Sequence, residues 1–261
     1  MQADQTEAVA HTEALATGRG KFGRDVLSIF QMKLFMGLQA WQWYLMGALV
    51  FPMSLFFWSR ALAPDDPEGV RRLMTGAMIF GVAMMTANSL SDQLVQDRFQ
   101  GRLKLLITMP MSKAAYALGV LAFGSIQSVA ILVLLMGLGI TIGVDFEPTW
   151  AFVPVVVPML LTMAGLTLVL SSLAPSAEVG GIINGMVGIL PVMLSPVFFT
   201  MEQAPLLLRW FGWVSPFRYA ADGIMKALSG RTDVWTEVAI LTGFAVTMMA
   251  VGFWRLHWRE R

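Results

Sequence analysis

Long runs without a charged residue alternate with short charged segments along the 261 residues of the chain. A run of roughly 17 to 25 apolar residues is enough for an α-helix to cross a bilayer. Such a segment must be helical, because lipid offers no partner for backbone N–H and C=O groups. Six runs meet this requirement, covering residues 34–59, 73–91, 114–144, 148–177, 179–201 and 238–254. The pattern predicts an all-α integral membrane protein with six transmembrane helices.

A further segment, residues 21–41, has a different pattern. Arg24, Ser28 and Gln31 recur at helical spacing on one face, while apolar side chains line another. A helix with this division of faces lies in the headgroup region of a membrane rather than across it. We therefore expect an amphipathic interfacial helix on the cytosolic leaflet. The alternative is that these residues begin a long first transmembrane helix.

Residues 202–228 are also rich in apolar side chains without forming a span. Arg209, Arg218, Asp222 and two prolines interrupt the apolar runs, so none is long enough to cross a bilayer. Tryptophan and tyrosine are frequent here, and both favour the membrane–water interface. We expect a re-entrant hairpin of two short helices in the outer leaflet, between spans five and six. An ordinary outer loop is the alternative.

The placement of lysine and arginine predicts the orientation, because cytosolic loops carry an excess of these residues. With the N-terminus inside, 11 of the 18 lie on the cytosolic side and 7 outside. Six spans return the C-terminus to the same side, so we expect both termini in the cytosol. The expected organisation is a flexible cytosolic tail (1–20), the interfacial helix (21–41), a six-span domain (42–256) and a second cytosolic tail (257–261).

Composition narrows the range of functions. Charged residues make up 13% of the chain, about half the share in soluble domains, which favours a bilayer over a soluble core. The net charge of +1 gives no indication of nucleic-acid binding, and the chain has no cysteine and two histidines. No acid or base falls inside a predicted span, which argues against an ion-coupled carrier and against an intramembrane enzyme. We expect no catalytic residue and no metal site.

The cytosolic segment between spans two and three, QDRFQGRLKLLITMPMSK at residues 96–113, has the pattern of a short amphipathic helix that ends at Pro110. Its polar side would present Asp97, Arg98, Gly101 and Arg102. Its apolar positions recur at helical spacing: Val95, Phe99, Leu103, Leu106 and Ile107. Anchoring to anionic lipid explains the bases here, but not the acid, the glycine or the proline.

This segment, continued as AAYALGV, resembles the signature of type-2 ATP-binding-cassette (ABC) permeases. The match falls on Asp97, Arg98, Gly101, Leu103, Leu105, Leu106, Pro110 and Ser112. The family more often has glutamate at the position of Asp97 and threonine at that of Arg102. A second stretch, SPFRYAADGIMKAL at residues 215–228, is similar to the family's proline-containing stretch ahead of the last span, with Ser215 in place of asparagine.

The resemblance implies a permease that dimerises with a second permease subunit, identical or different, in the cytoplasmic (inner) membrane. Each subunit would dock on a separate cytosolic ABC ATPase, which binds the ATP and Mg²⁺, so this chain would hold no cofactor. Segment 92–113 would act as the coupling helix, seated on the ATPase together with the interfacial helix. The implied coupling residues are Asp97, Arg98, Gly101, Arg102, Leu105 and Arg24.

The resemblance also implies that spans two and five line the transport pathway at the dimer interface. The pathway candidates in this chain are Met85, Asn88, Asn184, Phe198 and Phe199. For each of them, packing or a hydrogen bond between helices is the alternative role. Methionines on spans two and five favour an apolar or amphipathic cargo, because their flexible side chains can repack around varied ligands.

We therefore expect the permease subunit of an ATP-driven exporter, similar to the antibiotic-resistance branch of the family. Its substrate would be a drug-like or lipid-like amphiphile that moves outward. The alternatives are a permease for polysaccharide or glycolipid, and a membrane assembly or interaction protein without transport activity. Membrane lipid is expected as a further contact, and nucleic acid is not.

Overall fold

The computed structural model describes residues 19–39, 67–87, 112–198 and 205–255, together with single positions between 41 and 57. Helices make up most of this part of the chain, and its only β element is an isolated bridge between Glu147 and Ser229. The all-α prediction is therefore confirmed for the described residues. The helices are α2 (Arg19–Gln39), α4 (Pro67–Thr86), α7 (Lys113–Thr141), α8 (Phe152–Leu173), α9 (Ala177–Leu194), α10 (Leu206–Val214), α11 (Pro216–Leu228) and α12 (Trp235–Arg255).

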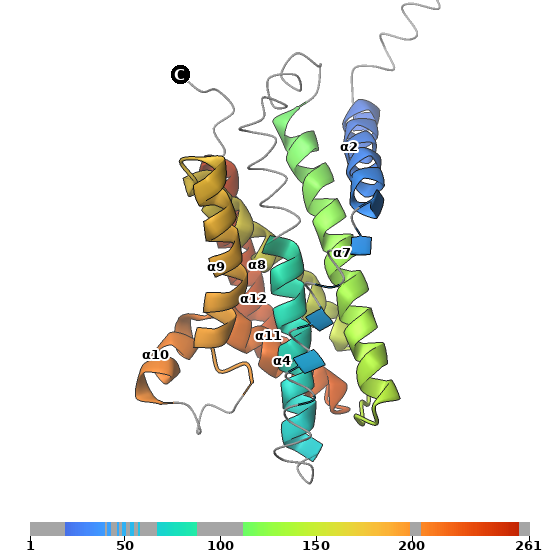
Figure 1. Cartoon of the computed structure of the whole chain (residues 1–261), viewed down its shortest axis with the longest axis vertical. Coiled ribbons are helices and arrows are strands. Elements are labelled where there is room, and N and C mark those ends of the chain that lie inside the picture. Colours follow the sequence, from blue (N-terminus) through green and yellow to red (C-terminus); the bar gives the residue numbers. More distant parts are fainter. Residues whose placement is uncertain are drawn as a thin grey trace, which may run out of the picture.

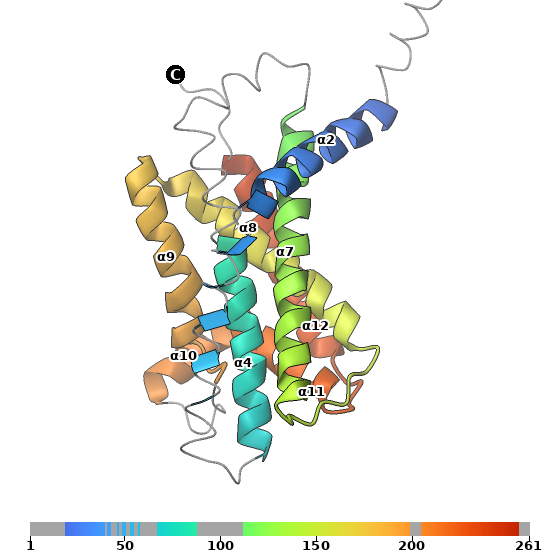
Figure 2. The same ribbon diagram turned by 45° about the vertical axis from the view of Figure 1, so that its right-hand side comes forward.

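Five long helices, α4, α7, α8, α9 and α12, run along the bundle (Figure 1). The short helices α10 and α11 lie at one end, beside the N-terminus of α4, and we call this the α11 end. Helix α2 lies at the opposite end, inclined across the first half of α7 (Figure 2). We call this second end the α2 end.

Helix starts follow from local capping. Ser112 begins α7, with its Oγ accepting a hydrogen bond from the Ala115 N–H at 3.1 Å. Ser176 caps α9 through the Val179 N–H at 3.2 Å. Ser215 caps α11 and is followed by Pro216 in the first helical position. Serine at the cap and proline in the first turn are both favoured, because the first helical N–H groups have no partner within the helix.

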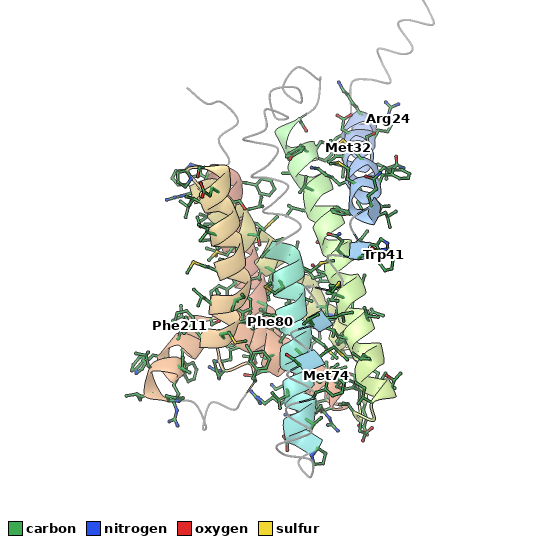
Figure 3. The ribbon with its side chains drawn as sticks, viewed as in Figure 1. Arg24, Met32, Trp41, Met74, Phe80 and Phe211 are labelled. Atoms are coloured by element: carbon green, nitrogen blue, oxygen red, sulfur yellow. The ribbon has the colours of Figure 1, made fainter. Side chains whose placement is uncertain are left out.

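Helix α4 forms the centre of the bundle. Its side chains are buried on all sides, as Met74, Met78, Ile79 and Val82 illustrate with at most 1% of their surface exposed. Helices α7, α8, α9 and α11 surround it, and Figure 3 shows Met74 and Phe80 within this core. An amphipathic surface helix would expose one face, so α4 is an interior element.

Large apolar side chains on the outside of α7, α8 and α12 stay exposed, including Val133, Val153 and Val246. Helices Phe152–Leu173 and Trp235–Arg255, and residues Ala115–Thr141 of α7, are long and apolar enough to cross a membrane. Together these features give the described chain the surface of a membrane protein.

Helices α8 and α12 pack closely through glycine. A Cβ added to Gly165 would lie 2.8 Å from the backbone N of Met249, and one added to Gly252 would lie 2.9 Å from Cβ of Leu168. The two helices are also joined by a hydrogen bond, in which the Thr162 hydroxyl of α8 donates to the Leu241 carbonyl of α12 at 3.0 Å. Small residues at such contacts let two backbones approach, which is the common packing mode of membrane helices.

Several boundaries differ from those predicted by charge-free runs. Helix α4 starts at Pro67, before the predicted 73–91, and α9 ends at Leu194, before the end of the predicted 179–201. The predicted interfacial helix at 21–41 corresponds to α2. Most of the predicted first span and nearly all of segment 92–113 lie outside the described residues.

Candidate transport pathway and coupling elements

The interface between α2 and α7 is formed by side chains packed onto glycine. Ile29 sits directly on Gly119, where an added Cβ would lie 2.7 Å from Cβ and Cγ2 of Ile29. Gly37 receives the ring of Phe123 in the same way, at 2.4 Å from an added Cβ. The side chain of Lys33, 2% exposed, is buried in this region, although the sequence places it at the edge of an apolar run. The absence of a Cβ at Gly119 thus lets α2 lie flat on α7.

Arg24 is the one candidate coupling residue that the structure describes. It lies on the exposed side of α2, directed away from α7 (Figure 3). The other five candidates, Asp97, Arg98, Gly101, Arg102 and Leu105, lie outside the described residues. Arg24 is therefore placed where a partner at the α2 end can reach it.

A buried pair of hydroxyls links α7 to α4. The Ser128 hydroxyl donates to the Gly124 carbonyl at 2.8 Å, and its Oγ lies 2.9 Å from Oγ1 of Thr86. Because the proton of Ser128 is used within α7, Thr86 is the donor across the interface. The pair lies at the C-terminal end of α4, toward the α2 end, and fixes α4 relative to α7.

The pathway candidates on α4 and α9 occupy different environments. Met85 is packed in the core with 7% of its surface exposed. Phe198 follows α9 and lies on Gly76 of α4, where an added Cβ would come within 2.6 Å of its ring. Asn184 is on α9, whereas Asn88 and Phe199 lie outside the described residues. Phe198 therefore contacts α4, the helix that faces α9 across the expected pathway.

At the α11 end, charged side chains join α4 to α11. Nη2 of Arg72 donates to Oδ1 of Asp222 at 3.1 Å, and Nε of Arg218 lies 3.4 Å from the other carboxylate oxygen. Arg71 donates to the Ser229 hydroxyl at 3.2 Å. The guanidinium of Arg218 also lies over the ring of Trp213, 4.5 Å from its centroid. One carboxylate thus serves two part-buried arginines, one on each helix.

A second ionic group holds the α11–α12 connection. Lys226 donates to Oε1 of Glu237 at 2.8 Å, and Arg231 forms two hydrogen bonds to Asp233, at 2.6 and 3.0 Å. The hydrogen bonds from Arg231 lower the pKa of Asp233, and those to Asp233 raise the pKa of Arg231. Both side chains stay charged across the physiological pH range.

The α7–α8 loop is attached to the same region by backbone hydrogen bonds. The Glu147 N–H donates to the Leu228 carbonyl at 2.8 Å, and the Gly230 N–H donates back to the Glu147 carbonyl at 3.1 Å. Gly230 has a φ of +77°, a conformation that side chains disfavour. Two loops about 80 residues apart are thus joined at the α11 end.

The role of Asp222 could not be predicted from the sequence. Its partner Arg72 is 150 residues away, and no local pattern indicates such a contact. The Arg218–Asp222 pair has the i,i+4 spacing of a helical ion pair, so this contact could have been predicted from the sequence. The buried link between Ser195 and Ser215 had no signal beyond the alignment of Ser215 with the family's asparagine.

Among the described residues, no group of three or more His, Cys, Asp or Glu side chains is placed to hold a metal ion. Their ionic groups join helices and loops to one another at the α11 end. The arrangement suits a rigid α11 end that is held to α4 and to the α7–α8 loop.

A comparison with family models identifies this architecture. The model for the ABC-2 type transporter matches residues 22–229. The chain belongs to the ABC-2 type transporter family. No curated protein matches it. As an ABC-2 membrane domain, the chain is a permease subunit of an ABC transporter, a transport subunit without catalytic function of its own.

The ABC-2 match extends from the first turns of α2 to the connection after α11. It includes segment 92–113 and both short helices at the α11 end. ABC-2 permeases typically work with a partner ATPase. The resemblance stated from the sequence is therefore confirmed at the level of the family.

Proposed function

We propose that this chain is the permease subunit of an ATP-driven exporter in the cytoplasmic membrane, with six spans and both termini in the cytosol. The match to the ABC-2 family over residues 22–229 is the observation that carries this proposal. The chain moves a drug-like or lipid-like amphiphile outward, and a separate cytosolic ATPase binds the ATP and Mg²⁺. It works as a dimer with a second permease subunit. Segment 92–113 is the coupling helix, and α10 and α11 form the re-entrant hairpin.

The contacts of α7 support the coupling route. Segment 92–113 continues into α7, which begins at Lys113, and α2 lies on the same helix at Gly119. A force applied by the ATPase to either element therefore acts on α7. The Thr86–Ser128 pair passes the movement to α4.

From α4 the route continues to the α11 end. Arg72 links α4 to Asp222 of α11, and Gly76 receives Phe198 from the turn after α9. A shift of α4 along its axis therefore moves both the hairpin and the aromatic side chain beside the proposed pathway. The pathway itself runs between α4 and α9, with Met85, Asn88, Asn184, Phe198 and Phe199 as its candidate lining.

The outer face of α9 supports dimerisation. Ile182, Met186 and Ile189 recur at helical spacing and remain exposed in the single chain. Nothing approaches within 4 Å of a Cβ added to Gly181, among the described residues. This smooth apolar strip suits a second permease subunit.

The coupling assignment is tested with the double variant Asp97→Ala, Arg98→Ala. We expect it to insert normally but to lose copurification of the ATPase in detergent. A matched control removes the exposed pair at the opposite end, Arg231→Ala with Asp233→Ala, and keeps the ATPase bound. Equal copurification in both double variants would overturn the coupling role of segment 92–113.

The pathway assignment is tested with Asn184→Leu in the reconstituted transporter. We expect stimulation of ATP hydrolysis by a fluorescent amphipathic dye to fall more than the basal rate. Thr247→Leu on α12, a polar-to-apolar change on another helix, should leave the stimulation intact. An equal loss of basal and stimulated rates in Asn184→Leu would instead assign Asn184 to packing.

A further inference from the structure

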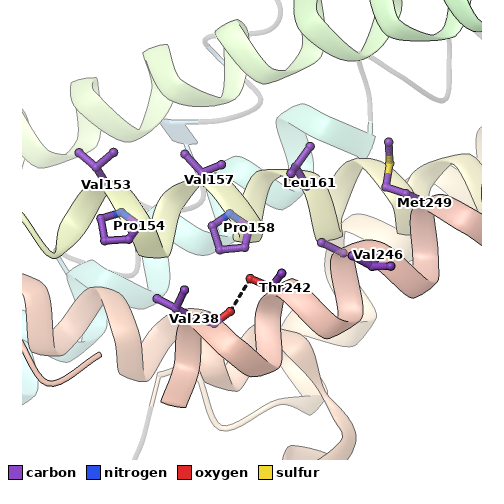
Figure 4. Close-up of a pocket in the computed structure, with 10 residues that line it drawn as sticks. Val153, Pro154, Val157, Pro158, Leu161, Val238, Thr242, Val246 and Met249 are labelled. Carbon is purple, nitrogen blue, oxygen red and sulfur yellow. Dashed lines mark hydrogen bonds between the residues drawn. The ribbon is translucent and has the colours of Figure 1, made fainter. Parts of the chain in front are cut away.

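An apolar groove runs along the outside of the bundle between α8 and α12 (Figure 4). Its volume is about 590 Å³. The rings of Pro154 and Pro158 turn toward α12, and Ala245, 4% exposed, is a buried member of the lining. The other lining residues are Val153, Val157, Leu161, Val238, Thr242, Val246 and Met249.

The groove offers no free polar group to a ligand. Thr242 is its one side chain that carries a hydroxyl, and that hydroxyl donates to the Val238 carbonyl of its own helix at 2.7 Å. A charged or hydroxylated ligand would lose its hydration here without compensation. A ligand segment made only of hydrocarbon has no such hydration to lose.

The dimensions of the groove match one leaflet of a bilayer. On α12 it extends from Val238 to Met249, which is about 16 Å at 1.5 Å per residue. Half of the roughly 30 Å hydrocarbon core is about 15 Å. Both helices that form it are apolar and long enough to cross a membrane, so the groove opens where lipid chains lie.

The end of the groove toward α11 carries groups suited to a lipid headgroup. Trp150 precedes α8 and Trp235 begins α12, within one turn of the lining residues Val153 and Val238. Their ring centroids are 6.0 Å apart, and their planes meet at 49°. Both rings are more than half exposed. Tryptophan at this depth marks the headgroup zone, and its face attracts ammonium groups.

An exposed ion pair completes this end of the groove. Arg231 and Asp233 lie in the connection just before Trp235, and the Thr149 hydroxyl donates to the Arg231 carbonyl at 3.1 Å, which places this connection beside Trp150. The pair presents one positive and one negative charge. A zwitterionic headgroup, with one phosphate and one ammonium, complements that arrangement.

We propose that the groove between α8 and α12 is a binding site for a single zwitterionic membrane phospholipid. One acyl chain lies along the groove, the ammonium lies over Trp150 and Trp235, and the phosphate faces Arg231. This lipid is a resident of the complex rather than its cargo, because the groove is lined by exposed side chains of α8 and α12, such as Val153 and Val246, and by none of α4 or α9.

The test measures phospholipid retained by the purified full-length protein. The protein is embedded in nanodiscs of phosphatidylethanolamine and phosphatidylglycerol in equal amounts, extracted with mild detergent, and examined by native mass spectrometry. Thr242→Phe fills the groove from an exposed position. Thr247→Phe is the control, because Thr247 is also exposed on α12, outside the groove lining, and makes the same hydroxyl bond, to Gly243 at 2.8 Å.

We expect wild type and Thr247→Phe to retain one phospholipid per chain, with about fivefold more phosphatidylethanolamine than phosphatidylglycerol. Thr242→Phe should retain none, and Trp150→Leu with Trp235→Leu should retain lipid without the preference. Equal retention in Thr242→Phe and wild type would overturn the site. So would a Thr242→Phe variant that keeps its lipid and loses its dimer, since a second chain would then occupy the groove. Neither readout depends on ATPase coupling or transport, so the result is independent of the proposed function.

Discussion

The contact of Ile29 with Gly119 predicts that a side chain added at Gly119 will loosen α2 from α7. A Cβ introduced by Gly119→Ala would lie 2.7 Å from Ile29 and 3.0 Å from the carbonyl oxygen of Val26. Carbon atoms in ordinary contact are about 3.5–4.0 Å apart, so α2 must move away from α7 by roughly 1 Å. Overpacking of this kind costs about 1–3 kcal/mol. A cost of about 2 kcal/mol corresponds to roughly a 30-fold rise in the local opening of α2.

Hydrogen exchange followed by mass spectrometry measures that opening directly. The amides of α2 should exchange roughly 30-fold faster in Gly119→Ala than in wild type. The control is Gly137→Ala on the same helix, because nothing lies within 4 Å of a Cβ there. Faster exchange of α2 should accompany weaker stimulation of the partner ATPase by cargo, since α2 then no longer moves with α7.

Removal of the Ile29 side chain separates this mechanism from general destabilisation. Ile29→Gly removes both the Cβ and the Cγ2 that lie 2.7 Å from the new methyl group. In the Ile29→Gly background, Gly119→Ala should therefore raise the exchange rate of α2 much less than it does in wild type. Equal exchange rates of α2 in Gly119→Ala and Gly137→Ala would refute this mechanism. So would a rise caused by Gly119→Ala that is as large in the Ile29→Gly background as in wild type.

Three further predictions concern the other links. Thr86→Val removes the donor to Ser128, and the free energy of unfolding should fall by about 0.6 kcal/mol. A loss above about 2 kcal/mol in reversible unfolding from mixed micelles would show that the hydroxyl does more than join two helices. Asp222→Asn leaves Arg72 and Arg218 part-buried without their carboxylate. The cost should be about 2 kcal/mol, between an exposed pair and a buried one, and Asp222→Glu should recover part of it; an unchanged midpoint in Asp222→Asn would contradict the link. The pKa of Asp233 is lowered from 3.8 by Arg231, so the stabilising contribution of this carboxylate is present above about pH 4 and is lost as pH falls through the lowered pKa. Asp233→Asn should flatten that acid dependence, measured as thermal midpoints along a pH series; an identical pH profile in both proteins would refute it.

Much of the helical framework could be predicted from the sequence, because apolar runs and capping residues act locally. The starts of α7 and α9 depend on Ser112 and Ser176, which are readable from the chain alone. The predicted second span starts at residue 73, the first position after Arg71 and Arg72, whereas the helix that contains it starts at Pro67. Both arginines lie within its first two turns. They end the apolar character of the segment but not its helix, because Pro67 and Glu68 form a favourable first turn.

The contacts between side chains in the candidate site were harder to predict from the sequence. The partners of Arg71 and Arg72 lie 158 and 150 residues away, and a single sequence contains no signal that joins them. The burial of Lys33 likewise depends on α2 lying on α7, and this depends in turn on Gly119. The family was identifiable because its signature is a contiguous segment with a fixed order of acid, base, glycine and proline.

The separation in sequence between α4 and its ionic partners on and after α11 has a consequence for biogenesis. The arginines of α4 find Asp222 and Ser229 only after about 150 more residues are made. At roughly 5–20 residues per second, that interval is about 8–30 s. During this time α4 can pack on α7 but not yet on α11. Ribosome-bound chains that stop before α11 should therefore hold α4 loosely, and release of α11 should be the step that fixes the centre of the bundle.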